Sequence, residues 1–265
     1  MDSDKAYEEE VQITGFGLAP VKAQGTSISY DSETQGPTAR YTHIAYALGY
    51  IVSYEERRDN LYETISMRRA KANAFSIAQT IENIATAVYN NAFSTSFPVA
   101  DGAALISTAH VNTTGGTYSN ALSPSADLAE ASLEDLTIQL MGLQTDRGRP
   151  ISIMPQSLHI PRQEWYNANR ILQSVLQNNT ANNAINVLKA TNAFPKGIKM
   201  NHYLTSATAW FIRTNCPQGM QMFWRDRPIF DQDNDFETKN AKAATYMRFS
   251  VGNTDPRGIA GSNGP

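Results

Sequence analysis

Residues 40–58 read RYTHIAYALGYIVSYEERR, and this stretch combines a strand pattern with a helix start. Tyr46, Leu48, Tyr50 and Val52 fall on one face at the two-residue period of a β-strand. Ser53 and Glu56 then have the S-x-x-E spacing of a capping box, in which each side chain bonds a free amide of a starting helix. The stretch therefore predicts a strand that leads directly into a helix.

The helix should be long, because neither proline nor glycine occurs from Glu55 to about Asn91. Apolar residues recur there at helical intervals, namely Leu61, Ile65, Ala72, Ala74, Ile77, Ile81, Ile84 and Val88. At 1.5 Å per residue such a helix spans roughly 50 Å. No heptad is sustained, so the pattern favours a single spine helix over a coiled coil.

On the other side of the opening stretch, residues 25–53 predict a long β-hairpin. Ser27 to Tyr30 alternate, a polar stretch follows, and the tip is expected at Gln35-Gly36-Pro37. An isolated two-stranded hairpin is marginally stable in water. Because one chain has little material to cover both this hairpin and the long helix, other copies of the chain are the expected partners.

The remaining elements predict an α+β fold, because strands and helices are segregated along the chain. Ser132 caps a second expected helix with Leu133, Leu136, Leu140 and Leu143 on one face, ending near Gly148. A short buried strand is expected in PISIMP at 150–155, and a third helix near Pro161. From Gly197 onward the segments IKMNHYL, AWFIR, MQMFW and AATYMRFSV read as strands, followed by a Gly/Asn/Pro tail.

Composition excludes several classes of protein. The formal net charge is −3, whereas domains that neutralise phosphates usually carry a basic excess. The single cysteine, Cys216, excludes an internal disulfide and a cysteine-based metal cage. No apolar run is long enough to cross a membrane, and the acidic N-terminus is not a secretory signal. We expect a soluble protein of a reducing cytoplasm.

No metal or cofactor site is expected. The four histidines, His43, His110, His159 and His202, are too far apart for a local zinc pair. Asp231, Asp233 and Asp235 imitate a calcium loop, but Phe236 and Lys242 replace the glycine and the bidentate glutamate that such a loop needs. GFGLAP at 15–20 has proline at the third glycine position of a dinucleotide fingerprint, and no Gly-Lys pair exists for a phosphate loop.

Residues 102–120, GAALISTAHVNTTGGTYSN, raise the question of whether His110 and Ser107 form a hydrolase site. A histidine at the end of an apolar run, before a Gly-rich loop, is compatible with catalysis. However, no G-x-S-x-G elbow is present to expose the serine. The favoured interpretation is a polar residue that hydrogen-bonds the start of a loop.

A set of longer stretches resembles the major capsid proteins of tailed bacteriophages, specifically the Mu-like major head subunit group. The stretches that carry the resemblance are SDKAYEE (3–9), GFG (15–17), YDSETQG (30–36), ARYTH (39–43), ALGYIVSYEE (47–56), DNLY (59–62), DGAALISTAH (101–110), DNDFETKN (233–240) and DPRGIAGSNG (255–264). They span nearly the whole chain. Family members usually carry an N-terminal arm before the first of them, whereas here it begins at Ser3.

This resemblance implies the Hong Kong 97-type capsid fold with an extended E-loop hairpin, a long spine helix, a P-domain and an A-domain. The implied parts are an N-terminal arm remnant (1–24), the E-loop (25–53), a P-domain (54–129) with the spine helix at 55–92, an A-domain (130–225), and return strands to the P-domain with the C-terminal tail (226–265). The segment 102–120 then becomes a connection between domains.

The implied function is structural and not enzymatic. Hexamers and pentamers would self-assemble into an icosahedral head that encloses double-stranded DNA without sequence-specific binding, within a virion assembled in the bacterial cytoplasm. Cement, scaffold and portal proteins are possible partners, and no cofactor or membrane is implied. The expected subunit-interface residues are Tyr30, Gln35, Gly36, Arg40, Tyr41, His43, Tyr46 and Tyr50. The alternatives are an encapsulin-like nanocompartment shell and a hydrolase that uses His110 and Ser107.

Overall fold

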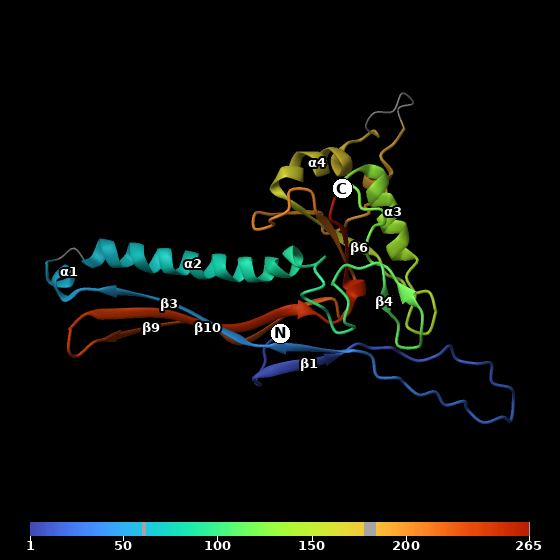
Figure 1. Cartoon of the computed structure of the whole chain (residues 1–265), viewed down its shortest axis with the longest axis horizontal. Coiled ribbons are helices and arrows are strands. Elements are labelled where there is room, and N and C mark those ends of the chain that lie inside the picture. The colour runs from blue at the N-terminus through green and yellow to red at the C-terminus, as the bar shows by residue number, and fades with distance from the viewer. Residues whose placement is uncertain (60–61, 178–183, 265) are drawn as a thin grey trace. The chain divides into compact units, whose positions relative to one another are not determined.

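The computed structural model describes residues 1–59, 62–177 and 184–264, which group into two compact units (Figure 1). Unit 1 comprises residues 1–8, 40–88 and 221–252, and unit 2 comprises residues 9–39, 89–220 and 253–265. Both units contain strands as well as helices. The α+β class expected from the sequence is therefore confirmed.

Unit 1 is built from a three-stranded sheet and a long helix. The sheet has the order β3-β10-β9, with β3 at Ile44–Val52, β10 at Ala241–Asn253 and β9 at Met220–Asn234. Helix α2, Tyr62–Asn90, lies along this sheet, and at 1.5 Å per residue its 29 residues span roughly 43 Å. Ile77 of α2 packs with Met247 and Phe249 of β10, which holds the helix against one face of the sheet.

The predicted helix start is confirmed, but the helix is divided. Ser53 caps α1, Tyr54–Arg58, with both reciprocal bonds of the capping box to Glu56 in place. Helix α1 ends at Asp59, whose N–H bonds the carbonyl of Glu55. The single helix expected at 55–92 is thus two helices, of which the second ends at Asn90, and Leu61 lies outside the described residues.

The hairpin expected at 25–53 is not formed, and this prediction was wrong. Residues 27–30 form no strand, and β3 pairs antiparallel with β10. The strands on either side of residues 12–37 are β1, Tyr7–Val11, and β2, Thr38–Thr42, and these two strands pair with each other. In this arrangement the Tyr46 side chain of β3 packs against Phe249 of the core. The polar residues 31–37 provide no apolar surface against which β3 could pack in the same way. Residues 12–37 therefore form one long loop, the 12–37 loop.

Unit 2 contains a four-stranded sheet of order β11-β8-β6-β7. Its strands are β6 (Pro155–Pro161), β7 (Ile198–Asn201), β8 (Trp210–Thr214) and β11 (Ile259–Ser262), and only the β6–β7 pair is parallel. The helices are α3 (Glu130–Met141), α4 (Trp165–Gln173) and α5 (Val187–Ala190), with short 3₁₀ turns at Arg162–Glu164 and Pro256–Gly258. A separate small ribbon pairs β4 (His110–Val111) with β5 (Thr117–Tyr118). Leucines of α3 and residues of β6 and β8 form the core.

Three local predictions in unit 2 need correction. Helix α3 is capped at Ala129, because Ser132 lies inside the first turn and accepts the Ala129 N–H, and it ends at Gly142, not near Gly148. The strand expected at 150–155 begins only at Pro155. The C-terminal segment, expected to be a tail, contains the fully buried strand β11. The 3₁₀ turn after Pro161 continues into α4, as predicted.

Candidate functional site

The 12–37 loop carries an unusual concentration of exposed large apolar side chains. Six of them are mostly exposed, with Val21 fully exposed and Tyr30 at 91% of its surface. The others are Ile13, Phe16, Leu18 and Ile28. Exposed apolar groups gathered on one segment, and not scattered singly, mark interaction surfaces.

The loop is attached to unit 2 at two places. At its base the Gln218 side chain accepts the Ile13 N–H at 3.0 Å and donates to the Val11 carbonyl at 3.1 Å. Farther along, Arg147 Nη1 lies 2.6 Å from Asp31 Oδ2. A hydrogen bond from the Gly17 N–H, together with Arg147, holds the pKa of the Asp31 carboxyl below its usual range. These contacts fix the loop backbone and leave its apolar side chains uncovered.

The residues expected at a subunit interface are divided between the two units. Tyr30 and Gln35 are exposed in unit 2, and Arg40 is exposed in unit 1, where its guanidinium lies 3.8 Å from the centre of the Tyr7 ring. Tyr46 and Tyr50 are half-buried on β3.

Three of the expected interface residues are buried within their own unit. Gly36 lies against Gln12, whose carbonyl oxygen would be 2.6 Å from an added Cβ. Tyr41 packs on Phe223 with ring centroids 4.9 Å apart. His43 lies between the hydroxyls of Ser3 and Ser250, and burial lowers its pKa. In the single chain, Gly36 and the side chains of Tyr41 and His43 are therefore covered by residues of their own unit.

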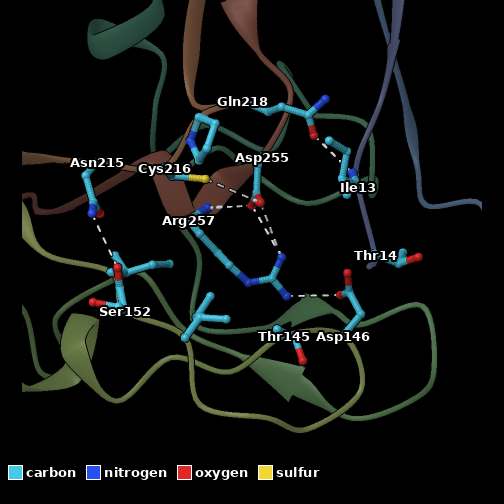
Figure 2. Close-up of a pocket in the computed structure, with 13 residues that line it drawn as sticks. Ile13, Thr14, Thr145, Asp146, Ser152, Asn215, Cys216, Gln218, Asp255 and Arg257 are labelled. Carbon is cyan, nitrogen blue, oxygen red and sulfur yellow. Dashed lines mark hydrogen bonds and ion pairs between the residues drawn. The ribbon is translucent and has the colours of Figure 1, made fainter. Parts of the chain in front are cut away.

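A cavity of about 400 Å³ lies in unit 2 beside a buried cluster of charges (Figure 2). Ile13, Ile151, Ile153 and Pro217 supply apolar walls, and Asp146, Cys216, Asp255 and Arg257 supply polar ones. Burial raises the pKa of the Cys216 thiol to about 12, with the Asp255 carboxylate acting in the same direction. Because the thiolate is the nucleophilic form, this thiol is unreactive at neutral pH.

Arg257 is the centre of the charge cluster. Its guanidinium contacts Asp146 at 3.0 Å and Asp255 at 3.4 Å, and also donates to Asn112 Oδ1 and to the Gln144 carbonyl. Asn112 comes from the loop after β4, Gln144 and Asp146 come from the segment after α3, and Asp255 lies in the same turn as Arg257. The cluster therefore holds the C-terminal segment against the rest of unit 2. The guanidinium of Arg257 and the carboxylates of Asp146 and Asp255 are all engaged in these structural contacts.

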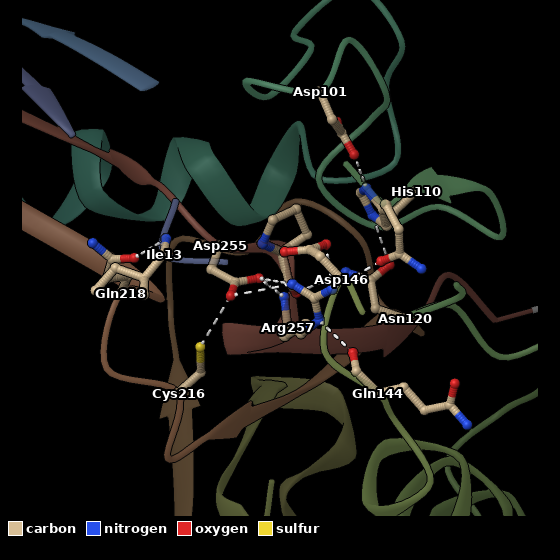
Figure 3. Close-up of polar contacts among 12 residues, drawn as sticks. Ile13, Asp101, His110, Asn120, Gln144, Asp146, Cys216, Gln218, Asp255 and Arg257 are labelled. Atoms are coloured by element: carbon tan, nitrogen blue, oxygen red, sulfur yellow. Dashed lines mark hydrogen bonds and ion pairs between the residues drawn. The ribbon is translucent and has the colours of Figure 1, made fainter. Parts of the chain in front are cut away.

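His110 is fully buried and contacts Asp101 and Asn120 (Figure 3). Its Nε2 lies 3.1 Å from Asn120 Oδ1, whereas the Ser107 hydroxyl accepts the Ala109 N–H. A hydrolase would need Nε2 to accept a proton from the serine. The structure does not bring Ser107 and His110 together in that way, and the predicted role of His110 in bonding the start of a loop fits the observed contacts.

Residues 1–59, 62–177 and 184–264 contain no group of three His, Cys, Asp or Glu side chains placed to hold a metal ion. Asp235, from the calcium-like run, instead pairs with Lys242 at 2.8 Å. No described helix is both long and apolar enough to cross a membrane.

Sequence reasoning missed the Arg257 cluster. Asp146 is 111 residues from Arg257, and each charge alone reads as a surface residue. A usable signal was the D-P-R-G run, because Asp255 caps the 3₁₀ turn by accepting the Arg257 N–H at 2.9 Å. That turn directs the arginine side chain into unit 2.

Comparison with known proteins identifies the family. The model of a family described as phage capsid protein matches residues 37–262. Solved structures with a similar fold include the capsid of Myoviridae phage XM1 (TM-score 0.57, 11% identity, covering 98% of this chain and 86% of that chain) and the capsid of a native GTA particle (0.57, 10%, 98% and 86%). A virus-like particle from Pyrococcus furiosus is also similar (0.53, 10%, 99% and 88%). No curated protein matches significantly. The chain belongs to the phage capsid protein family.

Proposed function

We propose that this chain is the major head subunit of a tailed double-stranded DNA bacteriophage and that it assembles into an icosahedral shell of hexamers and pentamers. The observation that carries the proposal is the 12–37 loop, whose apolar side chains are uncovered in their own chain. Membership of the phage capsid family and the shared fold support it. The proposed role of the chain is structural and not enzymatic.

We assign the parts of the Hong Kong 97-type fold as follows. Unit 1, with α2 as the spine helix, corresponds to the P-domain, and the sheet and helices of unit 2 correspond to the A-domain. The 12–37 loop takes the place of the E-loop and lies on a neighbouring copy. Of the expected interface residues, Tyr30, Gln35 and Arg40 are exposed enough to make such contacts.

Assembly draws on many modest contacts for each subunit, which together close a durable shell. The negative net charge of −3 suits a container, because a strongly basic inner wall would bind the packaged genome tightly. The proposed location is the virion, assembled in the host cytoplasm, with scaffold, cement and portal proteins as candidate partners. The Mu-like group remains the proposed subgroup, on the motifs between Ser3 and Gly264.

Electron microscopy of the purified full chain, alone and with the scaffold protein of its phage, tests the proposal. We expect rings of five and six subunits or closed shells. A chain that stays monomeric at high concentration under both conditions would contradict it.

A second candidate is an encapsulin-like shell that encloses proteins instead of DNA. The similarity of the fold to the virus-like particle from Pyrococcus furiosus supports this candidate. Particles isolated from the native source separate the two functions. Nuclease-protected double-stranded DNA is expected for a phage head, and protein cargo without DNA for a nanocompartment.

A further inference from the structure

His110 lies in unit 2 between two oxygen atoms, one on each side of its ring (Figure 3). Nδ1 is 2.6 Å from Asp101 Oδ2, and Nε2 is 3.1 Å from Asn120 Oδ1. The imidazole is 0% exposed. Water therefore cannot replace either contact, and the two oxygens decide which ring nitrogens carry protons.

The contact at Nε2 requires a proton on that nitrogen. The orientation of the Asn120 amide is fixed, because its Nδ2 donates to the carbonyls of Leu105, Pro256 and Ile259 at 2.8–3.0 Å. Its Oδ1 also accepts the Ser107 N–H at 2.9 Å. A flipped amide would place oxygen against three carbonyls and NH₂ against an N–H. Oδ1 therefore faces Nε2 as an acceptor, and Nε2 must donate.

The contact at Nδ1 requires a second proton. A bare nitrogen lone pair 2.6 Å from a carboxylate oxygen would be repelled, so a proton lies between the two atoms. The Ala103 N–H donates to Asp101 Oδ1 at 3.0 Å, a bond that favours the ionised carboxylate, and the pKa of Asp101 lies below its usual value despite its burial. The shared proton therefore belongs to Nδ1.

We propose that His110 is a buried imidazolium cation paired with the Asp101 carboxylate, and that this proton locks the 101–120 segment to the C-terminal segment of unit 2. Asn120 provides the link, because its amide bonds the imidazole on one side and the carbonyls of Pro256 and Ile259 on the other. The contact between these two segments of unit 2 therefore depends on the second proton of His110.

The charged groups around the ring are consistent with a cation. Asp101 faces it from the loop before β4, and the Tyr118 ring of β5 stacks on it at 5.2 Å. Tyr118 in turn contacts Arg257, which is paired with Asp146 and Asp255. With a neutral His110, these buried groups would hold three carboxylates against one cation. The imidazolium reduces that imbalance.

His43 and His159 lack this arrangement. His43 contacts two hydroxyls, Ser3 and Ser250, and His159 contacts the Ser157 hydroxyl. A hydroxyl donates or accepts as required, so it does not force a proton onto the ring. Burial lowers the pKa of both histidines, that of His159 to about 4. His159 is therefore expected to be neutral in the folded protein, and it serves as an internal control for the protonated His110.

Ring ¹⁵N spectra of the full-length subunit, labelled at histidine, test the proposal between pH 6 and 9. We expect both His110 nitrogens to be protonated at pH 8, while His159 has one bare nitrogen. A bare nitrogen on His110 at pH 8 in the folded protein would overturn the proposal.

Asp101→Asn provides the matched variant, because it keeps the shape and the bond to Ala103 but removes the carboxylate. We expect one bare His110 nitrogen at pH 8 in this variant and no change in Asp135→Asn, which alters an exposed carboxylate of α3. Two protonated nitrogens in folded Asp101→Asn would also overturn the proposal. If Asp101→Asn does not fold, the wild-type spectrum still decides.

Discussion

Arg257 Nη2 lies 3.0 Å from Asp146 Oδ1, and both side chains are only 3% exposed. The two residues are 111 positions apart in the sequence. A buried pair of this kind is weak evidence of net stabilisation, but removal of one partner leaves an uncompensated charge. The C-terminal segment is therefore part of the core of unit 2.

Arg257→Ala should strongly destabilise unit 2, because it leaves Asp146 and Asp255 without their cation. The expected loss is about 3–5 kcal/mol in the free energy of unfolding. Urea unfolding of the unassembled full chain measures it. Arg227→Ala is the matched control, because its pair with Asp2 is largely exposed and should contribute little. Equal losses in the two variants would contradict the structural role of Arg257.

Gly258→Ala should destabilise unit 2 by overpacking. An added Cβ would lie 2.3 Å from the Cα of Gly219, and the backbone would have to move. Overpacking typically costs about 1–3 kcal/mol, with larger losses where backbone must shift. In Gly142→Ala the nearest atoms are 3.5 Å away, so this control should unfold like the wild type. Thermal unfolding of both variants checks the contrast.

His159 should weaken the fold in acid. Burial lowers its pKa to about 4, and Arg213 and Lys199 act in the same direction. The unfolded histidine binds a proton near pH 6.5. Its stabilisation is therefore present above pH 6.5 and is lost as the pH falls toward 4, by on the order of 2–3 kcal/mol.

The measurement for His159 is the difference in unfolding free energy between the wild type and His159→Gln across that range. The difference should shrink as the pH falls. A difference that does not change between pH 7 and pH 4 would show that the imidazole titrates normally in the folded chain.

Replacement of Leu18 and Val21 by serine should reduce assembly without destabilising the subunit. Both side chains are exposed in the subunit and, in the proposed shell, covered by a neighbour. Light scattering at matched concentrations measures assembly, and thermal unfolding of the subunit checks stability. Thr26→Ser changes the same loop without removing large apolar surface. If the double variant assembles as readily as Thr26→Ser, the Leu18 and Val21 side chains do not contribute to the contact between subunits.

Local patterns predicted much of the fold. The Ser53 capping box is formed with both of its bonds, and the strands expected after Gly197 are present as β7 to β10. In both cases the signal lies within a few consecutive residues. The family resemblance, spread over short motifs, agrees with the capsid family model.

Long-range pairing could not be predicted in the same way. Strand β3 pairs with β10, almost 200 residues later, because their common face packs against α2. Nothing near residues 44–52 indicates that partner, and the sequence instead predicts a hairpin with the alternating residues 27–30. The Arg257–Asp146 pair was missed for the same reason, since its two residues are 111 positions apart and only the folded chain brings them together.

The most direct test of the account follows the 12–37 loop within assembled particles. Shells are assembled from an equal mixture of ¹⁴N- and ¹⁵N-labelled chains and treated with an amine-reactive cross-linker, and the cross-links of the exposed Lys22 are identified by mass spectrometry. We predict that many Lys22 cross-links join a light peptide to a heavy one. Lys22 cross-links that join only peptides of the same isotope would show that the loop stays on its own chain, and would contradict the account.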